Sequence, residues 1–175
     1  MDISTFLKRR FNLKPAYQPF NLLTFQLFNL STYQPINMKD QLAKRVVKQM
    51  MQDDLFSQWL QIKIIEVTEG YSKIKMELRE EMINGFNVIH GGIIFALADS
   101  AFAFACNNRN NLSMALDCSI SFNKASKPGD TLIADAKEIH NGKSTGLYLI
   151  IITNQNNDHV ALFKGTCFRT GKSLV

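Results

Sequence analysis

Apolar residues near position 40 recur at a helical spacing. Between Leu42 and Met51 they return every three or four residues, as is typical of an amphipathic helix. The pattern predicts a first helix from Lys39 to about Trp59, with one face buried.

The spacing then changes to the alternation of β-strands. Ile74, Met76 and Leu78 alternate with charged residues, which predicts a half-buried strand. The segment 147–153 is apolar on both faces and is expected in the middle of a sheet. Turns are predicted at residues 69–70, 127–130 and 140–146. The predicted strands lie within residues 60–70, 71–80, 113–122, 131–139, 147–153 and 159–171.

The most apolar stretch of the chain follows a loop of about a dozen residues, 79–90, which is long enough to suggest a function. From Ile93 to Cys106 it contains only Ile, Phe, Ala, Leu and Cys besides one serine and Asp99. A helix of this composition needs apolar cover on most sides. A curved antiparallel sheet of six strands wrapped around it provides that cover. The predicted fold class is therefore α+β, with the hotdog architecture.

Composition and charge exclude several classes of protein. The chain has 175 residues, 46% of them hydrophobic, which is enough for one domain with a core. Residues 1–37 carry +3 of the net charge of +5, and no Lys/Arg run occurs in the rest, so nucleic-acid binding is not expected. No apolar run reaches the roughly 18 residues of a membrane span. The three cysteines, Cys106, Cys118 and Cys167, lie in apolar segments, as expected of free thiols in the reducing cytoplasm.

Residues 1–37 differ in composition from the rest. They contain five Phe, two Gln-Pro pairs and a single acid. They lack the features of a signal peptide, although the basic, acid-poor composition weakly suggests a transit peptide. The favoured alternative is that Met38 is the natural start. We expect a poorly packed extension over residues 1–37 and the folded domain over 38–175.

Asp99 is the first candidate for chemistry. A buried aspartate can be structural when it pairs with a nearby cation or caps a helix. No Lys or Arg lies within two helical turns of Asp99, and caps occur at helix ends. Because burying an unpaired carboxylate costs several kcal/mol, a functional role is favoured.

The second candidate is the sequence His90-Gly91-Gly92 at the start of the apolar helix. Helix N-termini present unpaired N–H groups and a positive potential. Glycine lets a substrate approach these groups closely, which suits a developing oxyanion. For His90, a structural role that holds the loop and Asn84 in place is equally open.

The segment "NGFNVIHGGIIFALADSAFAFACN", residues 84–107, closely resembles the central motif of the PaaI-type (phenylacetic acid degradation) hotdog thioesterases. The resemblance covers roughly residues 40–172. It implies hydrolysis of acyl-CoA, with phenylacetyl-CoA-like acyl groups as family substrates. It also implies a homodimer or a dimer of dimers, no metal and no cofactor besides the CoA of the substrate.

The same resemblance implies a role for individual residues. Asp99 would be the catalytic carboxylate, and the Gly91 N–H, followed by Gly92, would bind the oxyanion. Asn84 would position the water or the thioester, with His90 supporting it.

Further substrate contacts are expected outside the motif. Asp117 stands where a related branch carries serine, and it is an accessory candidate that faces either the cleft or solvent. The basic loop residues Lys124, Lys127, Lys143 and Arg169 could meet the CoA phosphates, although each fits an ordinary solvated side chain equally well. Phe86, Phe95, Phe102 and Phe104 are available either for an aromatic pocket or for the core.

Helix geometry predicts how the site is assembled. Gly91 and Asp99 are eight residues apart, about 12 Å along a helix. A base and an oxyanion donor must each lie about 3 Å from the reacting atoms. One helix therefore cannot supply both groups to one thioester, and two helices crossing a dimer interface can.

Two other functions stay open. A hotdog dehydratase or hydratase would set a histidine and a second acid-base group against the acyl carbons, which fits His90 less well. A non-catalytic acyl-CoA-binding sensor would need an appended DNA-binding region, and residues 1–37 show no such pattern.

Overall fold

The computed structural model describes residues 37–175, and the predictions made for the N-terminal extension fall outside them. Within this range two helices, α3 (Met38–Asp53) and α4 (Leu55–Trp59), precede two strands, β1 (Lys63–Thr68) and β2 (Tyr71–Glu77). A one-turn 3-10 helix, η1 (Glu80–Met82), and the long helix α5 (Gly91–Asn107) follow. The last four strands are β3 (Ser113–Phe122), β4 (Thr131–Asn141), β5 (Thr145–Thr153) and β6 (His159–Arg169).

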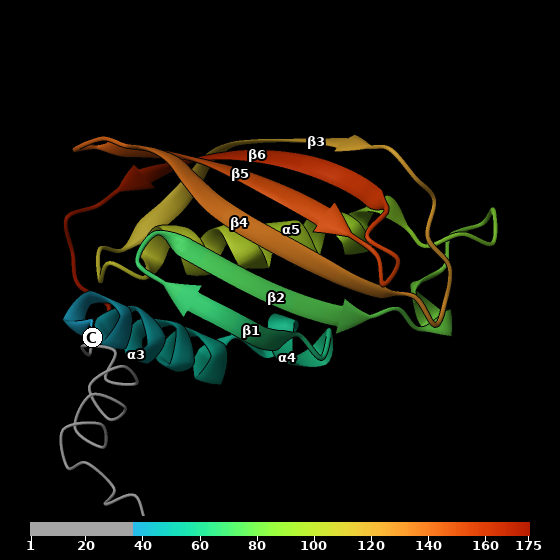
Figure 1. Cartoon of the computed structure of the whole chain (residues 1–175), viewed down its shortest axis with the longest axis horizontal. Helices are drawn as coiled ribbons and strands as arrows, with labels where there is room; N and C mark the ends of the chain where they lie inside the picture. Colours follow the sequence, from blue (N-terminus) through green and yellow to red (C-terminus); the bar gives the residue numbers. More distant parts are fainter. Residues whose placement is uncertain (1–36) are drawn as a thin grey trace, which may run out of the picture. The chain divides into compact units, whose positions relative to one another are not determined.

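All six strands form one antiparallel sheet in the order β1-β2-β4-β5-β6-β3. The sheet curves around α5, and α3 and α4 lie beside β1 (Figure 1). The predicted α+β class and hotdog architecture are confirmed. Residues 147–153 fall in β5, in the interior of the sheet as expected.

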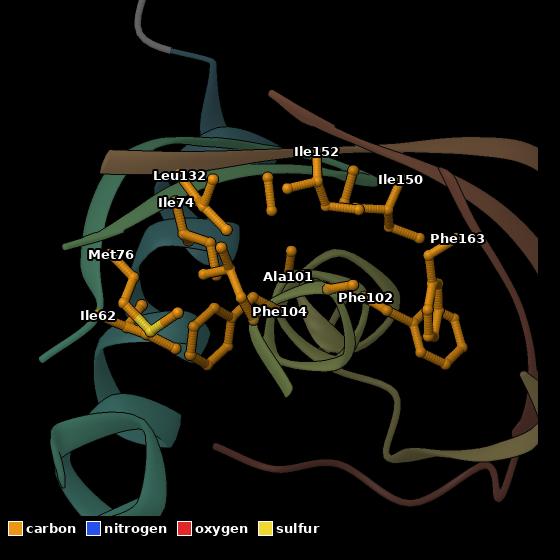
Figure 2. Close-up of a cluster of buried hydrophobic side chains, with 14 of the residues drawn as sticks. Ile62, Ile74, Met76, Ala101, Phe102, Phe104, Leu132, Ile150, Ile152 and Phe163 are labelled. Atoms are coloured by element: carbon orange, nitrogen blue, oxygen red, sulfur yellow. The ribbon is translucent and has the colours of Figure 1, made fainter. Parts of the chain in front are cut away.

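The core lies between α5 and the concave face of the sheet. Figure 2 shows Ala101 and Phe102 of α5 facing Ile150, Ile152 and Phe163. Phe102 reaches the sheet because β6 carries Gly165 opposite it. A Cβ atom at Gly165 would lie 2.9 Å from the Phe102 ring, closer than real Cβ contacts allow.

The prediction of one helix from Lys39 to Trp59 is wrong, because the helix is interrupted at Asp54. Asp54 has non-helical backbone angles (φ −88°, ψ 84°), and its carboxylate accepts a hydrogen bond from the Ser57 N–H at 2.9 Å. A short acidic side chain competes for backbone N–H groups in this way and favours a cap over a helix interior. The chain therefore ends α3 and begins α4 at this residue.

The strand β3 has the bounds that were predicted for it, residues 113–122. It pairs only with β6, so it forms an edge of the sheet. Met114, Leu116 and Phe122 are 58%, 63% and 52% exposed in the single chain. A register shift between Ala115 and Asp117 bulges the strand at Leu116. The described residues therefore leave the apolar side chains of Met114, Leu116 and Phe122 largely uncovered.

Candidate active site

The N-terminus of α5 leaves the Gly91 backbone donor free. His90 caps the helix: its Nδ1 accepts the Gly92 N–H at 2.9 Å, and its carbonyl oxygen accepts the Ile93 N–H at 2.9 Å. Across residues 37–175, no acceptor receives the Gly91 N–H. This donor lies at the positive end of a 17-residue helix, where it suits an oxyanion.

A cavity of about 300 Å³ lies at this helix end. Its lining residues are Ile89, Gly91, Ile94, Phe122, Asn123, Lys124, Ala125 and Ser126. The Phe122 ring packs closely over Gly91: a Cβ atom there would lie 3.1 Å from Phe122 Cζ, so a larger residue would have to shift the ring by a few tenths of an ångström. The buried Ser126 hydroxyl has no hydrogen-bond partner in the described part of the chain. The residues that line the cavity thus include one polar group without a partner besides the Gly91 donor.

Asp99 lies two turns further along α5. It is half-buried between buried neighbours, and within residues 37–175 its carboxylate makes neither an ion pair nor a hydrogen bond. Burial raises the pKa of Asp99, and the negative charge of Asp54 raises it further. The carboxylate was expected to be buried, but one side is open in the single chain. It has the properties of a base, because it is unpaired, accessible and more basic than usual.

Asn84 and His90 lie in the loop before α5, which is more ordered than a plain connection. Ile83 and Ile89 form an antiparallel bridge across it. The Asn84 Oδ1 accepts the Phe86 N–H at 2.8 Å. Among the described residues no hydrogen bond joins Asn84 to His90. His90 instead holds the loop through its backbone, whose N–H donates to the Met82 carbonyl at 2.9 Å.

Asp117 is exposed on the edge strand β3. Its charge and that of Asp99 both act on the neighbouring half-buried thiol, Cys118. Burial first, and then these two carboxylates, raise the pKa of Cys118 to about 11. Side chains alternate along a strand, and no hydrogen bond or ion pair of the described residues joins Asp117 to Asp99, so its accessory role stays a prediction.

The structure separates the predicted basic residues into two groups. Lys124 and Lys127 follow β3 and lie at the Gly91 end of α5, where Lys124 pairs with Asp158 at 2.6 Å. Lys143 lies in the turn after β4, at the far end of that 11-residue strand. A strand of this length spans roughly 35 Å, so Lys143 does not share a site with Lys127 within one chain.

Arg169 does not fit the predicted role of a phosphate ligand. Its side chain is only 4% exposed and binds Glu138 at 3.1 Å and the Asn141 Oδ1 at 2.8 Å. It also contacts the Tyr148 hydroxyl. A guanidinium held in this way is part of the core, and the distant partner Glu138 explains why the sequence alone did not show it.

The phenylalanines divide between core and surface. Phe102 and Phe104 are fully buried in the core, as Figure 2 shows. Phe95 packs edge-on against Phe163, with ring centroids 5.3 Å apart. Phe86 is 87% exposed in the loop beside Asn84. Of the four, Phe86 and the half-buried Phe95 remain available to a substrate.

Sequence reasoning missed two features near these groups. Phe122 was assigned only to a strand, yet it contacts Gly91. Ser57 and Ser100, whose hydroxyl oxygens lie 2.9 Å apart, connect α4 to the turn that carries Asp99. Asp54 is itself a favoured N-cap residue, and this preference is the sequence signal that could have indicated the helix break.

The curved sheet wrapped around a central helix defines the hotdog fold. The helix carries an unpaired carboxylate and a free N-terminal donor, which together form a candidate active site. Residues 86–161 match the model of the Thioesterase superfamily. The acyl-coenzyme A thioesterase PaaI of Escherichia coli is 42% identical over 126 residues, which cover 72% of this chain and 90% of that protein. The chain belongs to the thioesterase superfamily and is of the PaaI type.

Solved structures agree with this assignment. The E. coli PaaI protein from the phenylacetic acid degradation operon has a TM-score of 0.75 and 40% identity, covering 77% of this chain and 97% of that chain. A Streptococcus mutans protein bound to acetyl-CoA has a TM-score of 0.62 and 29% identity, covering 64% and 90% of the two chains. No helix of the described residues is long and apolar enough to cross a membrane.

Proposed function

We propose that this protein hydrolyses acyl-CoA thioesters to the free acid and CoA. The observation that carries the proposal is the unpaired Asp99 carboxylate on the same helix as the free Gly91 N–H. The similarity to the E. coli acyl-coenzyme A thioesterase supports it.

In this reaction the thioester carbonyl oxygen accepts the Gly91 N–H, and Asp99 takes a proton from the attacking water. The new C–O bond turns the carbonyl into an oxyanion, which the helix N-terminus stabilises. The C–S bond then breaks and CoA leaves as a thiolate, whose low basicity makes a dedicated acid unnecessary at neutral pH. Direct attack by Asp99, forming an anhydride that water hydrolyses, uses the same groups.

The protein acts as a homodimer in this proposal, with a further pairing into a dimer of dimers. The exposed apolar edge of β3 supports this assembly, since Met114, Leu116 and Phe122 lie on a strand without a Lys or Pro to block pairing. The dimer brings Asp99 of one subunit near Gly91 of the other.

The substrate in this proposal is CoA carrying an aromatic, phenylacetyl-like acyl group. Phe95 and Phe86 are the aromatic side chains open to such a group. Lys124 and Lys127, at the Gly91 end, meet the CoA phosphates, with Lys124 exchanging its Asp158 partner. The related E. coli PaaI protein comes from a phenylacetic acid degradation operon, which agrees with this choice.

A cytoplasmic location completes the proposal. Its support is the three free cysteines of the described residues, two of them buried, which suit a reducing compartment.

Release of free CoA tests the proposal directly. The purified protein is incubated with phenylacetyl-CoA, benzoyl-CoA and a series of alkyl-CoA esters, and the liberated thiol is measured with a thiol reagent. We expect turnover with all classes and the highest kcat/KM for an aryl substrate. Binding of these esters without release of CoA would instead indicate an acyl-CoA-binding protein. Hydration of an enoyl-CoA without thiol release would indicate a hydratase.

A further inference from the structure

The break between α3 and α4 places a carboxylate toward the central helix. Asp54 ends α3 and caps α4, and its carboxylate accepts two hydrogen bonds from Ser57. One comes from the backbone N–H at 2.9 Å and the other from the hydroxyl. Asp54 is therefore fixed at both carboxylate oxygens.

Ser57 carries this contact to α5. It is fully buried, and its hydroxyl oxygen lies 2.9 Å from that of Ser100, which is also buried. Because the Ser57 proton points to Asp54, the Ser100 hydroxyl donates to Ser57. Ser100 follows Asp99 directly in the chain. A continuous hydrogen-bonded path thus joins Asp54 to the turn of α5 that carries the proposed base.

The titratable groups around Asp99 come from several elements. Asp54 approaches from the α3–α4 junction, Cys118 from β3 with Asp117 beside it, and Cys106 lies two turns along α5. In the described residues no Lys or Arg forms an ion pair with Asp99. Asp54 is therefore a like charge that acts on an unpaired carboxylate, and its two hydrogen bonds from Ser57 hold it in place.

We propose that Asp54 is a positioning residue that acts on Asp99, because it fixes α4 against the turn of α5 that carries Asp99, through Ser57 and Ser100, and holds a negative charge on that side of the helix. Its effect on the rate rests on the proposed function. A base near its optimal strength transfers protons faster, as Brønsted behaviour requires. The direction of the Asp99 pKa, raised by burial and by Asp54, agrees with this role.

The test compares Asp54→Asn with the matched control Asp53→Asn. Asparagine caps a helix as well as aspartate does, so the first change removes the charge and keeps the bond from the Ser57 N–H. The amide NH2 cannot accept the Ser57 hydroxyl, so that second bond is lost with the charge. Asp53, the last residue of α3, is exposed and bonds only to Gln49. Its replacement makes the same change of net charge one position away.

In Asp54→Asn we expect the acidic limb of the pH profile of kcat/KM to move to lower pH and the plateau to fall severalfold. Asp53→Asn keeps both at the wild-type values. Asp54→Ala removes the cap as well, so it shifts the profile in the same direction and also lowers Tm. A merely structural role for Asp54 predicts a change of Tm without a shift of the profile.

A carboxyl ¹³C NMR titration of Asp99, with Asp99→Asn used for assignment, measures the coupling without turnover. The Asp99 pKa should fall in Asp54→Asn and stay unchanged in Asp53→Asn. An unchanged Asp99 pKa in Asp54→Asn, or an unchanged profile in the active enzyme, overturns the inference. If the wild-type protein releases no CoA from any ester, the proposed function fails, and the titration still decides whether Asp54 acts on Asp99.

Discussion

Gly91 and Asp99 lie on one helix, α5, eight residues apart, which separates them by about 12 Å. The first offers a free N–H and the second an unpaired carboxylate. Both groups must lie about 3 Å from the reacting atoms of one thioester. The separation within one chain is therefore the strongest reason to place each site between two subunits.

Replacement of Asp99 by Asn should abolish most of the turnover. The neutral amide keeps the volume of the side chain and loses the basic oxygen, and a loss of at least about a hundredfold in kcat is expected. Initial rates of CoA release measure it, with Asp53→Asn as the control for a surface carboxylate. An Asp99→Asn enzyme within a few-fold of wild type would contradict the assignment.

The same variant should be more stable than wild type at neutral pH. Burial and the Asp54 charge raise the pKa of Asp99 in the folded protein, so the folded state binds this proton more tightly than the unfolded state. The stability that Asp99 contributes is then lost as the pH rises through the raised pKa. Thermal melts should show a higher Tm for Asp99→Asn at pH 7 and a vanishing difference in acid. Equal melting temperatures of the wild type and Asp99→Asn at both pH values would show that the ionised Asp99 does not destabilise the folded protein.

Leu116→Lys should disrupt the dimer and the activity together. Leu116 is 63% exposed at the bulge of β3, and a lysine on an edge strand opposes pairing with a second chain. Sedimentation velocity should show a smaller species, and CoA release should fall in proportion. Ser119→Lys places the same charge at a second exposed position of the same edge strand and should also weaken the dimer. If neither substitution alters the sedimentation, the subunits associate elsewhere.

Arg169→Ala should affect stability rather than CoA binding. The substitution leaves the largely buried Glu138 without its Arg169 partner, and loss of one member of a buried pair costs about 3–5 kcal/mol. Arg109 still contacts Glu138, so the lower end of that range is expected. Urea unfolding measures the loss, and Arg45→Ala on the exposed face of α3 should stay within about 0.5 kcal/mol of wild type. A raised KM for acyl-CoA with unchanged stability would restore the role of phosphate ligand.

The sheet and the central helix were predictable because local patterns encode them. The alternation of Ile74, Met76 and Leu78 appears as three buried residues of one strand face. The apolar run after Gly91 became the helix that the sheet surrounds. Residues 84–107 matched the family motif directly, so the candidate site residues were also accessible from the sequence.

The remaining features depend on contacts between distant parts of the chain or on a second chain. Arg169 is buried because Glu138 lies 31 residues away on β4, and helical periodicity did not reveal that Asp54 would cap a new helix. Leu116 is exposed in the single chain, and its proposed cover is a second copy of the chain, which a single-chain pattern does not encode. At these positions tertiary contacts override the local preference of the sequence.

Complementation between two inactive variants tests the shared site most directly. Asp99→Asn removes the carboxylate. Gly91→Pro removes the N–H at the first helical position, where proline is well tolerated, although its ring must displace Phe122 slightly. Circular dichroism first shows that each variant folds, and subunit exchange is verified with labelled chains.

In a mixed dimer one site receives both defects and the other neither. Random exchange makes about half of the dimers mixed, so roughly a quarter of the wild-type CoA release should return if the sites act independently. If both variants fold, exchange is complete and no activity returns, the carboxylate and the oxyanion donor belong to one chain. That result would contradict the account.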